Sequence, residues 1–125
     1  MPVKWLTKNK CMALLRNNVY GRLATCAKDG QPYITQLNYV LHDDKIYFHT
    51  AFKGRKLDNI KENDKVCFEI SGPGKMYVTP HARNFTMRFW SVLVFGKAKE
   101  VKDIKLKFKV MNLLMDKYAK GFEYE

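Results

Sequence analysis

Apolar and polar residues alternate in several short stretches of the 125-residue chain, a pattern typical of β-strands with one buried face. Five strands are predicted, at Leu23–Cys26, Pro32–His42, Lys45–Thr50, Lys65–Ile70 and Phe89–Val101. Short turns separate most of them. Asp29-Gly30 is a turn signal between the first two strands, and Asp43-Asp44 turns the chain between the next two.

Helical spacing replaces this alternation at both ends of the chain. Lys8–Arg16 contains helix-forming residues and apolar side chains, and Asn17-Asn18 stops it. Near the other end, apolar residues recur every three or four positions, which predicts a helix whose stripe belongs to the core or to an interface. The stripe consists of Ile104, Phe108, Met111, Met115 and Tyr118. A short helix is also predicted at Leu57–Ile60.

Five closely spaced strands with a helix at each end predict a mainly β protein with flanking helices, built as an antiparallel β-barrel. The length favours one domain, 1–125. Gly72-Pro73-Gly74 breaks the fourth strand, and the segment 75–87, which contains Pro80, is predicted to be a long irregular loop.

The long strand predicted at 32–42 has two unlike faces. One carries Tyr33, Thr35, Leu37, Tyr39 and Leu41. The other carries Ile34, Gln36, Asn38 and Val40, which places two amides between two apolar residues. This mixed face suits half-burial against a polar ligand, and it equally suits a barrel rim that meets water.

Composition narrows the class of protein. Apolar residues make up 46% of the chain, enough for a core and too many for disorder. The chain has no apolar run of about 18 residues, so no membrane span is expected. Its first residues contain no apolar signal core, so a cytoplasmic protein is expected. Cys11, Cys26 and Cys67 are isolated and follow no metal-binding spacing, so neither a metal site nor a disulfide framework is expected.

The formal net charge of +11 predicts an anionic partner. Nucleic acid, a membrane surface and a phosphorylated cofactor all satisfy that condition. Many lysines lie between positions 97 and 120, mostly on the solvent face of the predicted helix. The aromatic residues of the strands are not interleaved with Lys or Arg, which disfavours a small barrel that binds single-stranded nucleic acid.

The segment from His49 to Lys56 carries the clearest candidate chemistry. It follows a strand, passes through the turn Ala51–Gly54, and ends in Arg55-Lys56 at the start of a helix. Backbone N–H groups at a helix start carry partial positive charge, and Arg and Lys bind phosphate oxygens. The segment therefore predicts a phosphate site, and the alternative is a solvated basic turn.

Several motifs in this order resemble the FMN-binding split-barrel superfamily, typified by pyridoxamine 5′-phosphate oxidase. The resemblance runs from about residue 8 to residue 118 and is greatest to the small nitroimidazole-resistance flavin reductases. The motifs are Gly21–Thr25, Asp29–Tyr33, Ile46–Thr50, Gly54-Arg55-Lys56, Val66–Phe68 and Ser91–Ala98.

The resemblance implies a homodimer with two FMN sites at the subunit interface. It implies that the long strand runs along the flavin ring, that the end of the next strand meets the ribityl and phosphate groups, and that the basic pair clamps the phosphate. It also implies that the second subunit lends a residue to the flavin. By this match the cofactor-binding residues are Thr35, Gln36, Leu37, Asn38, His49, Thr50, Arg55, Lys56, Trp90 and Ser91.

The implied activity is that of an FMN-dependent oxidoreductase, which passes electrons from a reduced nicotinamide to a small nitroaromatic or quinone-like acceptor. No catalytic acid or base is assigned, since the cofactor carries the chemistry. The alternative is a protein that carries flavin or haem without turnover, with His49 or His81 as the haem ligand. Thr35 and Val40 stand where the oxidase has Arg and Lys, so oxidation of pyridoxamine phosphate is not expected. Relatives usually continue past the last helix into further β structure.

Overall fold

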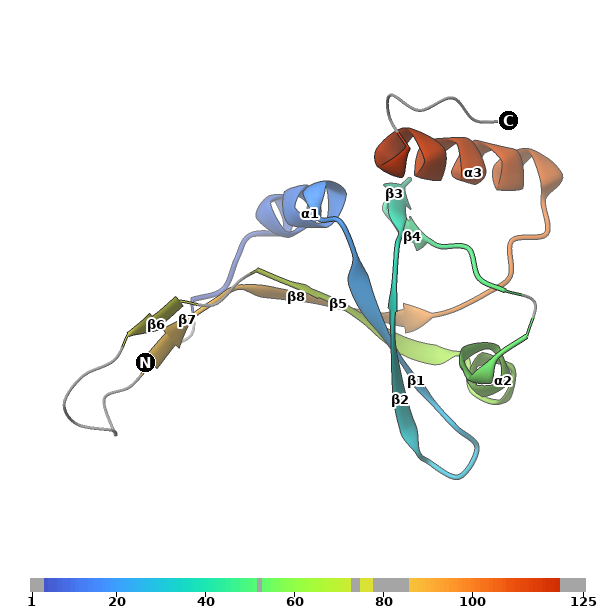
Figure 1. Ribbon diagram of the computed structural model, residues 1–125, viewed down its shortest axis with the longest axis horizontal. Coiled ribbons are helices and arrows are strands. Elements are labelled where there is room, and N and C mark those ends of the chain that lie inside the picture. The colour runs from blue at the N-terminus through green and yellow to red at the C-terminus, as the bar shows by residue number, and fades with distance from the viewer. Residues whose placement is uncertain (1–3, 52, 73–74, 78–85, 120–125) are drawn as a thin grey trace.

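The computed structural model describes residues 4–51, 53–72, 75–77 and 86–119 (Figure 1). Among the described residues, two runs of four strands separate three helices. The elements are α1 (Lys8–Asn17), β1 (Gly21–Cys26), β2 (Pro32–Leu37), β3 (Val40–His42), β4 (Lys45–Tyr47), α2 (Arg55–Glu62), β5 (Lys65–Ser71), β6 (Lys75–Tyr77), β7 (Thr86–Arg88), β8 (Ser91–Lys97) and α3 (Ile104–Tyr118).

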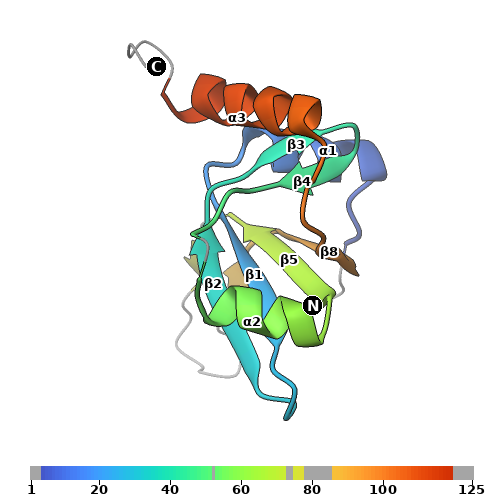
Figure 2. The same cartoon turned by 90° about the vertical axis from the view of Figure 1, so that its right-hand side faces the viewer.

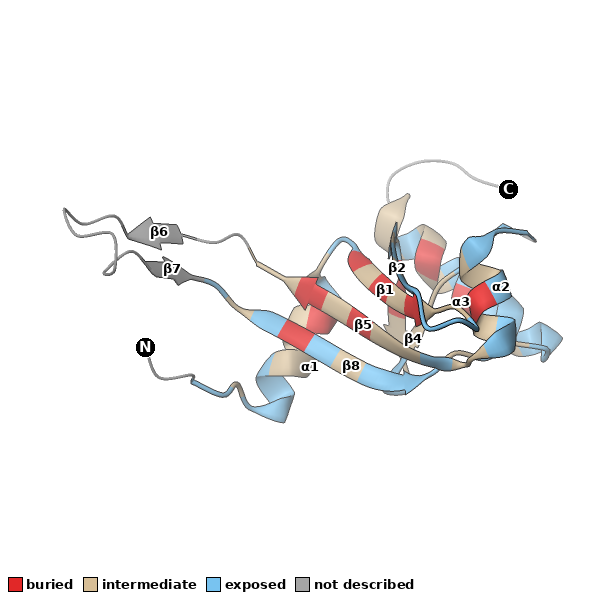
Figure 3. Cartoon of the chain, turned by 90° about the horizontal axis from the view of Figure 1, so that it is seen from below, coloured by how far each residue is buried: buried red, intermediate tan, exposed pale blue. Residues whose placement is uncertain are grey.

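A four-stranded sheet in the order β2-β1-β5-β8 forms the centre of the protein. Its inner face follows the alternation of the sequence, with Leu23, Phe68, Ile70 and Val92 buried. In register, Leu23 lies opposite Phe68 on one side and Thr35 on the other. Figure 3 shows the buried positions side by side across β1, β5 and β8. Full burial of such a side chain contributes roughly 1.5–3 kcal/mol, so this face holds the sheet and its helices together.

Two helices pack near this sheet. Helix α1 is capped by Thr7, whose side chain accepts a hydrogen bond from the backbone N–H of Lys10, and it buries Leu15 in the core. Helix α2 lies beside β1 and β2 (Figure 2) and packs Ile60 against the same core. Residues 49–51 and 53–56 of the predicted phosphate motif face strand β2 across a cavity.

A second, smaller cluster joins the β3–β4 hairpin to α3 (Figure 1). Both turn residues of the hairpin, Asp43 and Asp44, have positive φ (51° and 59°), as a tight two-residue turn with the right twist requires. Helix α3 buries Val110 and Leu114 against Val40. The hairpin and α3 thus form a unit above one end of β2.

The single strand predicted at Pro32–His42 is wrong, because the chain leaves the sheet after Leu37 and β3 begins at Val40. The cause is Tyr39, which is fully buried. Its hydroxyl donates a hydrogen bond to the carbonyl of Leu15, and its ring meets Phe68 edge-on at 4.8 Å between centroids. Tyr118 and Lys117 of helix α3 bind the backbone N–H and carbonyl of Tyr39. These groups therefore need no hydrogen bonds from a neighbouring strand.

Other elements differ in extent. The segment 75–87 was predicted to be irregular, but Lys75–Tyr77 pairs with Thr86–Arg88 as an antiparallel ladder; Pro80 and His81 lie outside the described residues. The strands predicted at 45–50 and 89–101 are shorter, at 45–47 and 91–97. The helical stripe predicted at the C-terminal end is not all core, since Ile104 and Phe108 are exposed and Val110 and Leu114 are buried.

The predicted class, mainly antiparallel β with flanking helices, is confirmed. The strand ladders form three separate sheets, and among the described residues no ladder closes them into a barrel. None of the described helices is both long and apolar enough to cross a lipid bilayer.

Candidate functional site

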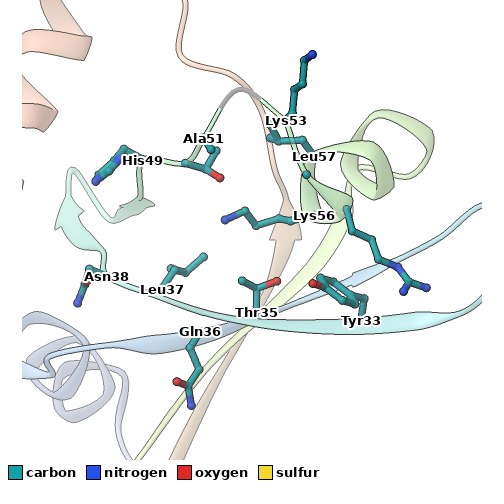
Figure 4. A pocket seen from close by; sticks show the side chains of 13 residues that line it. Tyr33, Thr35, Gln36, Leu37, Asn38, His49, Ala51, Lys53, Lys56 and Leu57 are labelled. Carbon is teal, nitrogen blue, oxygen red and sulfur yellow. The ribbon is translucent and has the colours of Figure 1, made fainter.

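A cavity of about 480 Å³ lies between β2, the segment after β4 and the start of α2. Figure 4 shows the side chains around it. Its volume lies in the range of small-molecule and cofactor sites, roughly 300–1,000 Å³. The lining residues are Tyr33, Thr35, Gln36, Leu37, Asn38, His49, Thr50, Ala51, Lys53, Gly54, Arg55, Lys56 and Leu57. All the residues predicted as cofactor contacts between positions 35 and 56 are therefore brought together.

Helix α2 presents an uncapped N-terminus to the cavity. Gly54 precedes the helix with φ 151° and ψ 165°, a conformation that is essentially restricted to glycine. Its carbonyl accepts the first helical hydrogen bond, from Asp58, and within the described residues no side-chain cap is found at this helix start. Because the N–H groups of the first turn carry partial positive charge, this end of the cavity favours an anion.

The two cations at the start of α2 differ in position. Lys56 is half-buried and points into the cavity (Figure 4), with its Nζ 5.6 Å from the ring centre of Phe48. Burial lowers the pKa of Lys56, because removal from water disfavours the charged ammonium. Arg55 is exposed, and its guanidinium carbon lies 4.9 Å over the ring of Tyr33. Lys56 is thus the cation that an anion inside the cavity would meet.

Thr35 adds a hydroxyl that lacks a partner. Its side chain points from β2 toward Lys56 (Figure 4). Its Oγ1 is buried, and among the described residues it makes no hydrogen bond. A buried hydroxyl without a partner costs about 1–3 kcal/mol, and hydrogen bonding to a ligand in the cavity would remove that cost. The donor set at this end is therefore an ammonium, a hydroxyl and backbone N–H groups.

The other end of the cavity is formed by Leu37, Asn38 and His49 (Figure 4). The Asn38 amide donates to the backbone carbonyl of Val19 at 3.3 Å, so this donor is engaged within the protein. The Gln36 side chain points to the opposite face of β2 (Figure 4), so Gln36 lines the cavity with its backbone. The roles predicted for these two amides toward a flavin ring stay predictions.

Helix α3 holds the corner where β2 ends. The backbone N–H of Tyr39 donates to the Tyr118 hydroxyl at 3.1 Å, and that hydroxyl lies within hydrogen-bond distance of the carbonyls of Val19 and Tyr39. The Lys117 ammonium donates to the Tyr39 carbonyl at 3.0 Å and lies 3.9 Å over the Tyr39 ring. Burial lowers the pKa of Lys117 to about 8 and raises that of Tyr39 to about 12. These bonds fix the chain next to Leu37 and Asn38.

Trp90 and Ser91 do not line this cavity. Trp90 lines a smaller hollow beside α1, and Ser91 is exposed at the start of β8, opposite Ser71. The prediction that they reach the cofactor of a second subunit stays a prediction. The lining residues that were not among the predicted cofactor contacts are Tyr33, Ala51, Lys53, Gly54 and Leu57. Alternation along β2 already puts Tyr33 on the face of Thr35.

No metal-binding group is found at the cavity or elsewhere, since nowhere in the described part of the chain do three His, Cys, Asp or Glu side chains gather. The donors that line the cavity, an ammonium, a hydroxyl and backbone N–H groups, favour an anion.

Sequence comparison decides the family. Residues 7–125 match the model of the pyridoxamine 5′-phosphate oxidase family. The chain belongs to that family. Comparison with curated proteins gives no match.

Solved structures share the fold of this family member. A structure described as a 5-nitroimidazole antibiotic resistance protein from Bacteroides thetaiotaomicron aligns with TM-score 0.79 and 22% identity, over 95% of this chain and 71% of that one. A FAD-binding protein from Mesorhizobium loti aligns with TM-score 0.67 and 27% identity, over 96% and 80%. A protein from Mycobacterium smegmatis that binds FAD and haem aligns with TM-score 0.78 and 18% identity, over 92% and 55%.

Proposed function

We propose that this family member binds a phosphorylated flavin, FMN, in the cavity above β2 and acts as a flavin-dependent oxidoreductase. The buried Thr35 hydroxyl without a partner, which faces the Lys56 ammonium, is the observation that carries the proposal. The Mesorhizobium loti protein is described as FAD-binding, which supports a flavin as the ligand.

The donor set fits the phosphate group. A phosphate monoester carries between one and two negative charges at neutral pH and offers three acceptor oxygens. Lys56, the Thr35 hydroxyl and the first N–H groups of α2 would hold it, while Thr50 and His49, which also line the cavity, would contact the ribityl chain. Arg55 would act from the rim, because its guanidinium is exposed.

The part of β2 around Leu37, at the other end of the cavity, would lie along the flavin ring. Half-buried Leu37 provides an apolar surface there, and strand backbone provides polar groups at its edge. When bound, the flavin supplies the chemistry, accepting a hydride from a reduced nicotinamide and passing two electrons to a nitroaromatic or quinone-like acceptor. The protein residues bind and orient the cofactor, and no side chain is required as an acid or base.

A homodimer belongs to the same proposal. Phe95 and Leu93 on the outer face of β8 are 77% and 54% exposed, and Phe108 of α3 is 68% exposed. Exposed apolar side chains on one strand and one helix are typical of protein interfaces. In this assembly Trp90 and Ser91 would approach the cofactor of the second subunit, and the open sheets would complete a split barrel.

The visible absorption spectrum of the purified protein tests the cofactor directly. A yellow protein that releases FMN, identified by mass spectrometry, is expected. A colourless protein that also fails to bind added FMN, FAD or riboflavin would refute the proposal. Once flavin is bound, oxidation of reduced nicotinamide that depends on an added acceptor is expected.

A haem carrier is the second candidate, because exposed His49 lines the cavity and one structural relative is described as binding both FAD and haem. A red protein whose haem spectrum changes on His49→Ala would favour it over the flavin proposal.

Oxidation of pyridoxamine phosphate is not part of the proposal. That substrate brings a second phosphate, which needs its own cations. Thr35 is neutral, and Val40 is buried against α3. Equal rates of pyridoxal phosphate formation and nicotinamide oxidation would contradict this.

A further inference from the structure

Helix α2 is attached to the sheet by a polar contact. Asn59 is the buried residue of this helix, with 5% of its surface exposed, while its apolar Leu57 and Ile60 are only half-buried. The Asn59 amide donates to the hydroxyl of Thr25 on β1 at 3.0 Å, and Thr25 is itself 3% exposed. A buried polar pair adds little net stability over apolar packing, but it defines one arrangement of the elements that it joins.

The position of Asn59 on the helix connects this contact to the cavity. Arg55 and Lys56 precede Asn59 by four and three residues, so all three lie along the same side of α2. One residue of helix corresponds to a rotation of about 100°. If α2 turned by one residue on the sheet, Lys56 would leave the cavity, so the hydrogen bond of Asn59 fixes where the ammonium points.

Thr25 links the same contact to β2. It pairs with Tyr33 in register, and its hydroxyl lies 3.5 Å from the Tyr33 carbonyl. Tyr33 supports the guanidinium of Arg55 and stands two residues before Thr35 on the same face. The Thr25 hydroxyl thus connects helix α2, which carries Arg55 and Lys56, to strand β2, which carries the unpartnered Thr35 hydroxyl.

We infer that Asn59 and Thr25 are positioning residues for the phosphate end of the cavity: their hydrogen bond sets the rotation of α2, and thereby selects a phosphorylated flavin over riboflavin. The inference rests on the proposed function. It assigns to these two residues an effect on the phosphate alone, since neither lines the cavity.

The test compares the affinities of FMN and riboflavin, measured by quenching of flavin fluorescence. Thr25→Val with Asn59→Leu replaces both polar groups by apolar groups of similar shape, so the fold should survive. The ratio of FMN to riboflavin affinity is expected to fall about tenfold in this double variant, with riboflavin affinity changed by less than about twofold. Thr25→Ser, which keeps the hydroxyl, should retain the wild-type ratio.

Two further measurements separate positioning from general damage. In a Lys56→Met background, the double variant should lower the ratio by less than in the wild type, because residues that act through one another are not additive. Thr25→Val alone gives the same readout if the double variant does not fold. A wild-type ratio in either Thr25→Val variant would overturn the inference and leave the proposed function standing. A wild type that binds no flavin would overturn both.

Discussion

Lys56 and Arg55 are neighbours in sequence, but the structure predicts unequal contributions to flavin binding. Lys56→Met removes a half-buried ammonium that points into the cavity and keeps a side chain of similar length. Arg55→Met removes a charge that is exposed and stacked on Tyr33. The comparison therefore tests the geometry of α2 and not only the presence of two cations.

The magnitudes follow from burial. A hydrogen bond to a charged group contributes about 1.5–3 kcal/mol, so loss of the Lys56 bond should weaken FMN roughly tenfold to a hundredfold. Water and salt screen an exposed charge, so loss of Arg55 should weaken FMN by about fivefold or less. The Lys56 bond lies in a partly desolvated setting, and raising the salt concentration should change its effect less than that of Arg55.

Titration of each purified variant with FMN, followed by flavin fluorescence, gives the two affinities. Riboflavin is the matched control, because it lacks the phosphate and its affinity should be the same in both variants and the wild type. A larger loss in Arg55→Met than in Lys56→Met, or an equal loss of riboflavin, would refute the assignment of Lys56 to the phosphate.

Three other features give measurable predictions. Gly54→Ala should destabilise the protein by about 1–3 kcal/mol in chemical denaturation through backbone strain alone, since no atom lies within 4 Å of the added Cβ; unchanged stability would show that φ at this position is not held near 151°. The pKa of Lys117 falls from 10.5 to about 8 on folding, so between these pH values the unfolded chain binds more protons and stability rises with pH. Thermal melts should therefore show the wild type gaining stability relative to Lys117→Met between about pH 8 and pH 10, while the titration of Tyr39, which both proteins contain, cancels in the comparison; a constant difference would contradict the burial of this amine. Phe95→Lys should convert a dimer into a monomer in light scattering, because it places a charge on the exposed apolar face of β8; a dimer that persists would place the interface elsewhere.

Local patterns were sufficient to predict most of the cavity. The strand, turn and basic helix start at His49–Lys56 are contiguous in sequence, and alternation puts Thr35 and Leu37 on one face of β2. Such features depend on near neighbours, so they can be inferred before the fold is known. The resemblance to the family predicted that these separate segments contact one ligand.

Long-range contacts account for what was missed. Alternation continues through Asn38 and Tyr39, yet the strand ends there, because Tyr39 binds Leu15 on α1 and Tyr118 on α3. Nothing near Asn59 in sequence indicates that it is buried against Thr25. The exposure of Phe108 is equally hidden, since its spacing matches a core stripe while the hairpin packs against Val110.

The contact between α3 and the end of β2 also has a consequence for biosynthesis. Tyr118 is 79 positions away from the Tyr39 backbone that it binds. A ribosome adds about 5–20 residues per second, so roughly 4–16 s pass between the synthesis of Tyr39 and that of Tyr118. During that interval β1 and β2 can already pair, but the wall of the cavity at Asn38 has no support from α3. Until α3 has been made, the nascent chain therefore carries an unfinished cavity and an uncovered edge strand.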